Sequence, residues 1–153
     1  MTQKIILILL LSFSFVAAYG QKGGNSSDGY KKVEYIGKAK TLIQDIEKYK
    51  FTQLVIKKDK VFPAEGYWIL LDANNMLHFL KRDMTPPKGQ NGSEKIADGI
   101  YFNCWGCPNS DQCNPGKDTE GNWTCKDPCN TCVGETLIDN DKYENIQIAM
   151  GPL

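Results

Sequence analysis

The chain has 153 residues and a mass of 17.2 kDa, with 18 basic and 18 acidic residues, one histidine, six cysteines and 41% apolar residues. This composition excludes a multidomain assembly, a collagen-like or low-complexity chain and a strongly charged tail protein. What remains is a small globular protein.

Residues 1–20 have the three-part pattern of a secretory signal peptide. Lys4 precedes an apolar stretch from Ile5 to Val16, and small residues follow. The rival interpretation, an uncleaved membrane anchor, needs about 20 apolar residues. We therefore expect a cleaved signal peptide over residues 1–20, a flexible lead-in over residues 21–29 and a single secreted domain over residues 30–153, with no membrane span after cleavage. We expect the mature protein to be secreted into the extracellular space or the periplasm.

Residues 33–49 predict an amphipathic helix. Apolar side chains recur there at three- and four-residue steps, with polar residues between them: Val33, Ile36, Ala39, Leu42, Ile43, Ile46 and Tyr49. This period is helical, and it would place one stripe of a helix of about 12 to 16 residues on a core.

Short apolar or β-branched runs after this helix predict an antiparallel sheet. The expected strands, in chain order, are residues 51–56, 67–71, 76–80, 100–103, 136–138 and 145–150. Asn74-Asn75 predicts a tight hairpin in which Leu71 faces His78. The predicted fold class is therefore α+β: an N-terminal amphipathic helix on a small antiparallel sheet, followed by a loop-rich, Cys-stapled extension.

All six cysteines lie between residues 104 and 132. Their spacing is C-x2-C-x5-C-x11-C-x3-C-x2-C: Cys104, Cys107, Cys113, Cys125, Cys129 and Cys132. The segment is rich in Gly and Pro and almost without aliphatic residues, so it cannot stabilise itself by burying apolar surface. An even cysteine count behind a signal peptide favours three disulfides, and the spacing does not select their pairing.

Two other chemistries fit parts of this pattern. The thiolate pairs Cys104/Cys107 and Cys129/Cys132 could form a structural zinc site, although the 21 residues between them exceed the usual gap of roughly 15 to 20. Cys104 and Cys107 alone could form the dithiol of a thiol-disulfide oxidoreductase, with Cys104 as the attacking thiol. Disulfides remain the preferred interpretation, with no cofactor and with zinc as the alternative.

Catalytic patterns are scarce. His78 is the only histidine and lies between apolar strand residues, and neither G-x-S-x-G nor H-E-x-x-H occurs. A sheet histidine in a structural role is the simpler interpretation. The lysines are scattered rather than clustered with aromatic residues, which argues against nucleic-acid binding.

The sequence thus predicts a secreted, disulfide-stabilised binding protein that is not an enzyme. Its expected partner is an extracytoplasmic protein or a glycan, met by the Cys-rich segment or by the polar loop over residues 83–94. Trp105 and Trp123 are the candidate binding residues, because large aromatics on a rigid loop suit a binding surface. The alternative is that these rings pack around the disulfides.

Overall fold

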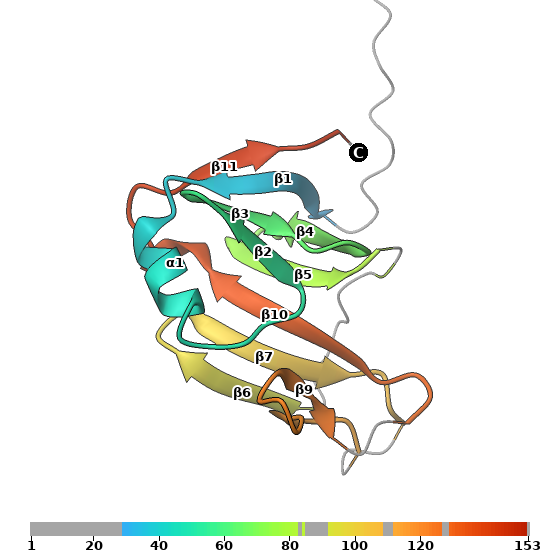
Figure 1. Ribbon diagram of the computed structural model, residues 1–153. Helices are drawn as coiled ribbons and strands as arrows, with labels where there is room; N and C mark the ends of the chain where they lie inside the picture. The colour runs from blue at the N-terminus through green and yellow to red at the C-terminus, as the bar shows by residue number, and fades with distance from the viewer. Residues whose placement is uncertain (1–28, 83, 85–91, 109–111, 127–128, 153) are drawn as a thin grey trace, which may run out of the picture.

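The computed structural model of the chain describes residues 29–82, 84, 92–108, 112–126 and 129–152. The predicted signal peptide, the lead-in apart from Gly29, and most of the loop over residues 83–94 lie outside these residues. The described chain is mostly antiparallel β-structure that curls around one short helix (Figure 1).

The described elements, in chain order, are β1 (Lys31–Gly37), α1 (Lys40–Ile46), β2 (Leu54–Lys57), β3 (Lys60–Pro63), β4 (Tyr67–Leu71), β5 (Met76–Lys81), β6 (Gly92–Ala97), β7 (Ile100–Trp105), β8 (Asn114–Lys117), β9 (Trp123–Lys126), β10 (Val133–Asp139), the 3-10 turn η2 (Asn140–Lys142) and β11 (Gln147–Met150). Within the described residues, one 9-stranded sheet has the order β2-β3-β1-β4-β5-β10-β7-β6, with β11 also paired to β1. Strands β8 and β9 form a separate 2-stranded sheet.

The predicted fold class is wrong, because residues 33–49 do not form an amphipathic helix on a small sheet. Lys31–Gly37 is strand β1, and α1 has only 7 residues. The register of β1 against β11 shifts between Val33 and Tyr35, which marks a β-bulge. A bulge breaks the two-residue alternation of a strand, so Val33 and Ile36 both enter the core. Their three-residue spacing imitates a helix.

The predicted hairpin is confirmed, but its register is wrong by one residue. Strands β4 and β5 pair with Leu71 opposite Leu77, rather than opposite His78. The cause is Asp72, whose Oδ1 accepts hydrogen bonds of 2.8 Å from the backbone N–H groups of Asn74 and Met76. This carboxylate cap makes a longer turn than the expected two-residue loop.

The hydrophobic core fills one end of the inner face of the curled sheet. Helix α1 contributes Leu42, Ile43 and Ile46. The central strands contribute the residues that point towards the helix: Ile69, Leu77, Phe79, Ile100 and Ile138. Because side chains alternate along a strand, the next inward positions of the same strands lie beyond the core, at the other end of this face.

The Cys-rich segment is an insertion rather than an extension. It connects β7 to β10, which are adjacent in the sheet, and Trp105 pairs directly with Val133. We call residues 104–132 the Cys-rich lobe. It contains the small β8–β9 hairpin, and the rest of the chain returns to complete the main sheet with β10 and β11 (Figure 1).

Candidate binding cleft

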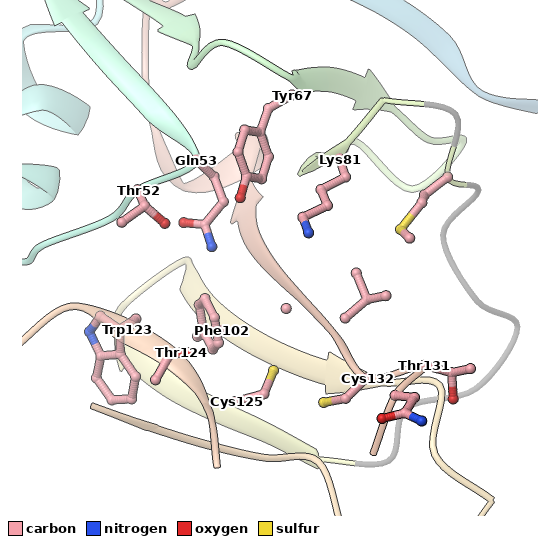
Figure 2. A pocket seen from close by; sticks show the side chains of 14 residues that line it. Thr52, Gln53, Tyr67, Lys81, Phe102, Trp123, Thr124, Cys125, Thr131 and Cys132 are labelled. Carbon is pink, nitrogen blue, oxygen red and sulfur yellow. The ribbon is translucent and has the colours of Figure 1, made fainter. Parts of the chain in front are cut away.

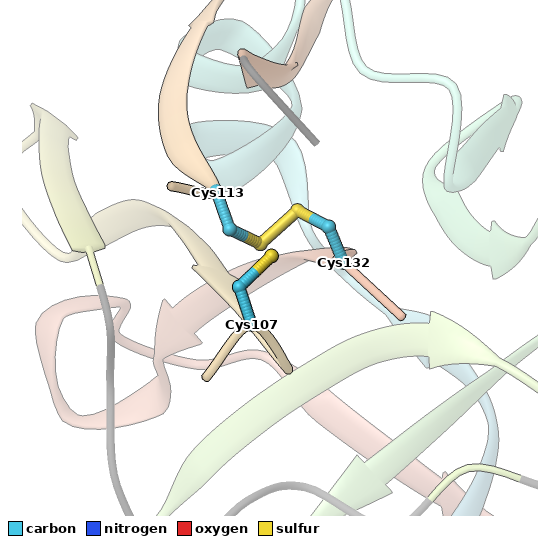
Figure 3. A group of neighbouring side chains, drawn as sticks. All are labelled: Cys107, Cys113 and Cys132. Atoms are coloured by element: carbon cyan, nitrogen blue, oxygen red, sulfur yellow. A yellow bond between two sulfur atoms is a disulfide. The ribbon is translucent and has the colours of Figure 1, made fainter. Parts of the chain in front are cut away.

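Three disulfides hold the Cys-rich lobe, as the sequence predicts. Cys104 is bonded to Cys125, Cys107 to Cys129 and Cys113 to Cys132, so none of the six cysteines is free. The sulfur atoms of Cys107, Cys113 and Cys132 lie within 4.8 Å of one another (Figure 3). The protein is thus a small disulfide-stabilised protein.

The two alternative cysteine chemistries would require other sulfur arrangements. Cys104 and Cys107 belong to different disulfides and are not bonded to each other. The four cysteines of the zinc alternative, which are Cys104, Cys107, Cys129 and Cys132, are distributed over all three disulfides. Thiolates for zinc would therefore form only after reduction, and the zinc site stays a prediction.

A cleft of about 380 Å³ lies between the main sheet and the Cys-rich lobe (Figure 2). Residues of both parts line it: Thr52, Gln53, Tyr67, Lys81, Met84, Phe102, Trp123, Thr124, Cys125, Asn130, Thr131, Cys132, Val133 and Gly134. Most of the lining side chains carry a hydroxyl, an amide or an aromatic ring. Such a mixture suits a polar ligand that also offers a flat apolar face.

The sheet wall of the cleft continues the inner face beyond the core. Tyr67 of β4 and Lys81 of β5 are directly opposite in the antiparallel ladder, so their side chains leave the same face close together. Gly134 of β10 also lines the cleft. A Cβ atom there would lie 2.8 Å from Cζ of Phe102, so the glycine makes room for the Phe102 ring.

Gln53 is a buried polar residue of the same wall. Its side chain is only 4% exposed, and its Oε1 accepts a hydrogen bond of 3.2 Å from Oγ1 of the fully buried Thr136. Figure 2 shows the amide nitrogen of Gln53 pointing towards the cleft, near the ring of Phe102. The buried hydroxyl thus orients the amide, with its donor group towards the open space.

The two tryptophans of the sequence prediction have different environments. Trp123 lines the cleft, but its ring packs on Phe102 with centroids 5.9 Å apart, and the Lys117 amine lies 5.0 Å from its centroid. Trp105 is absent from the cleft lining. Both indole nitrogens are buried without a hydrogen-bond partner among the described residues. Trp123 therefore both faces the cleft and packs within the Cys-rich lobe, and its role in binding stays a prediction.

His78 lies on the other face of the sheet, in a buried polar cluster. Its Nδ1 is 3.3 Å from Glu135 Oε2, and its Nε2 is 3.3 Å from Asp72 Oδ2. The second oxygen of Glu135 accepts a hydrogen bond from Nδ2 of Asn103. The Tyr30 ring lies edge-on to the His78 ring, with the two ring centroids 5.4 Å apart. His78 is therefore a buried sheet residue whose two ring nitrogens both contact carboxylates, and its structural role stays a prediction.

Sequence reasoning missed Gln53, Tyr67 and Lys81 as cleft residues and Glu135 as a buried acid. Only Lys81 could have been found from the sequence. It is a charged residue two positions after Phe79 and four after Leu77, so it shares the strand face of these two buried residues. The other three residues fit ordinary strand or loop patterns, and long-range pairing brings them to their places.

Gly106 supports the connection between β7 and the lobe, and its replacement is expected to destabilise the protein. Its φ is +103°, and a Cβ atom would overlap the carbonyl oxygen of Thr131. We expect Gly106→Ala to lower the free energy of unfolding by more than about 1 kcal/mol in urea titrations. Gly121→Ala is the matched control, because Gly121 has φ +83° with nothing near its Cβ position. An equal loss in both variants would contradict a specific overlap at Gly106.

Comparisons with protein-family models, with curated proteins and with solved structures found no significant match. Among the described residues, no helix has the length and apolar character needed to cross a membrane. The three disulfides are compatible with an oxidising compartment, where such bonds form and persist.

Proposed function

We propose that this protein is a secreted, non-enzymatic binding protein and that the cleft between the main sheet and the Cys-rich lobe is its ligand site. The observation that carries the proposal is the two-sided construction of the cleft. Tyr67 and Lys81 come from the sheet, while Trp123 and Thr124 come from the lobe. The Cys104–Cys125 disulfide joins strand β7 of the sheet to strand β9 of the lobe.

A covalently held cleft favours binding. Walls that are already ordered lose less conformational entropy when a ligand enters, so more of the contact energy becomes affinity. The volume of about 380 Å³ is within the range of small-ligand sites. It suits a short glycan or a few residues of a partner protein.

The chemical character of the lining supports binding over catalysis. The described lining contains no histidine, no carboxylate and no free thiol. General acid–base or nucleophilic catalysis depends on such groups within reach of the substrate. Hydroxyl and amide groups, by contrast, orient a polar ligand by hydrogen bonding.

The proposal is tested by blocking the cleft. Thr52 is exposed and lines the cleft, so Thr52→Trp would place a large ring at its mouth. We expect this variant to bind at least about tenfold more weakly to any ligand that the unmodified protein retains on glycan and peptide arrays. Thr119→Trp is the matched control, because Thr119 is exposed but absent from the lining. Equal binding by both variants would move the ligand site elsewhere.

A further inference from the structure

We infer that the ligand of this cleft carries a carboxylate group, which Lys81 and Gln53 bind from the sheet wall. The inference rests on the function proposed above and adds the chemical class of the ligand. It depends on three features of the lining, which are its charge, its unpaired donor groups and their placement on one face.

The charge of the lining is positive. Lys81 is the one charged side chain among the described lining residues. No ion pair joins Lys81 to a carboxylate of the described residues, and its side chain is exposed at the cleft. An ammonium group in a concave site produces a field that attracts anions.

Gln53 supplies a second donor group. Its Oε1 is occupied by the Thr136 hydroxyl, and no described residue accepts a hydrogen bond from its Nε2. Its Nε2 is not one of the buried polar atoms that lack a partner, so it is open on the cleft side, where an acceptor on a ligand can receive its hydrogen bond. Gln53 is only 4% exposed, so an acceptor can reach its amide from few directions. The cleft is one of these directions (Figure 2).

The set of donors matches a carboxylate. One ammonium gives a single positive charge, while the Gln53 amide and the Tyr67 hydroxyl add neutral donors on the same wall. A carboxylate carries one negative charge on two acceptor oxygens. A phosphate carries up to about two charges and is usually bound by several cations or by an arginine. A single lysine therefore favours the carboxylate.

The test compares acids with their neutral counterparts by isothermal titration calorimetry on the secreted protein. The probes are trigalacturonate and its methyl ester, and N-acetyl-trialanine and its C-terminal amide, so that a sugar acid is distinguished from a peptide carboxylate. We expect at least one acid to bind at least about tenfold more tightly than its neutral counterpart. Lys81→Gln should abolish this preference, and Lys81→Arg should retain part of it.

Lys31→Gln is the control for the loss of one positive charge, since Lys31 is exposed and lies outside the lining. Binding of neutral and acid forms with equal affinity, lost in Thr52→Trp, would overturn the carboxylate inference and keep the proposed function. Acid binding that survives both Thr52→Trp and Lys81→Gln would overturn both. Failure of both acids to bind would overturn the inference, while neutral ligands found on the arrays would keep the proposed function.

Discussion

Removal of the Cys104–Cys125 disulfide is expected to lower the free energy of unfolding by about 3 kcal/mol. The bond closes a loop with a sequence separation of 21, and Cys104 is fully buried. The double variant Cys104→Ala/Cys125→Ala frees this loop in the unfolded chain and detaches β9 from β7 in the folded one. Urea unfolding followed by circular dichroism measures the loss, and ligand binding in the cleft should weaken with it.

The Cys113–Cys132 disulfide provides the comparison. It closes a loop of similar length, with a sequence separation of 19, so its removal should have a similar entropic cost. The Cys104–Cys125 bond would still hold β9, and the packing of Phe102 on Trp123 should persist. We expect a red shift of tryptophan emission only in the Cys104→Ala/Cys125→Ala variant. The same shift in both variants would contradict a separate role for the bond between β7 and β9.

Replacement of His78 by leucine is expected to have a comparable effect, a loss of about 3 kcal/mol. Glu135 is 2% exposed and contacts His78 and Asn103. Leucine would leave the buried carboxylate with the Asn103 amide alone, and an uncompensated buried charge is costly. His78→Gln keeps a hydrogen-bond donor at this position and should lose less. Equal losses in the two variants, measured by urea unfolding, would show that packing rather than pairing with Glu135 matters.

The same cluster predicts a pH dependence of stability. Burial lowers the pKa of His78, but hydrogen bonds and charges from Glu135 and Asp72 outweigh it, so the pKa is raised above 6.5. A raised pKa means that the charged ring stabilises the fold fully below pH 6.5, and that this stabilisation is lost as the pH rises through the raised value. The fall should be absent from His78→Gln, which has no group titrating there.

Asp72 sets the acid limit of this pH window. Burial raises its pKa, but hydrogen bonds from Met76, His78 and Asn74 outweigh burial, and the pKa is lowered below 3.8. Its contribution is therefore present above pH 3.8 and lost as the pH falls through the lowered value. The free energy of unfolding, measured from pH 3 to pH 9, should be greatest between about pH 4 and pH 6.5.

The sequence was sufficient for features that depend on local patterns. The β4–β5 hairpin follows from two apolar runs that flank turn residues. The disulfides follow from an even cysteine count in a segment too poor in aliphatic residues to form a core. The pairing of those cysteines depends on the path of the chain between them, which spacing alone does not describe.

The errors have a common physical origin in non-local pairing. The bulge in β1 lies in a strand that contacts β11, β3 and β4 along different parts of its length, which its own sequence does not reveal. The apolar run at residues 136–138 predicts a strand but not its place in the sheet, where β10 lies between β5 and β7. The cleft could not be predicted either, because Gln53, Lys81 and Gly134 come from separate parts of the chain and meet only through the sheet order.

The insertion of the Cys-rich lobe between paired strands has a consequence for the order of folding. In the main sheet, β7 and β6 join the other strands only through β10. The β7–β10 hairpin therefore closes across the whole lobe instead of a short turn, and the entropic cost of closure rises with loop length. Each disulfide within the lobe shortens this path. Disulfide formation and completion of the sheet are thus coupled. In the reduced chain, β6 should pair with β7 long before this β6–β7 hairpin pairs with β10 and so joins the rest of the sheet.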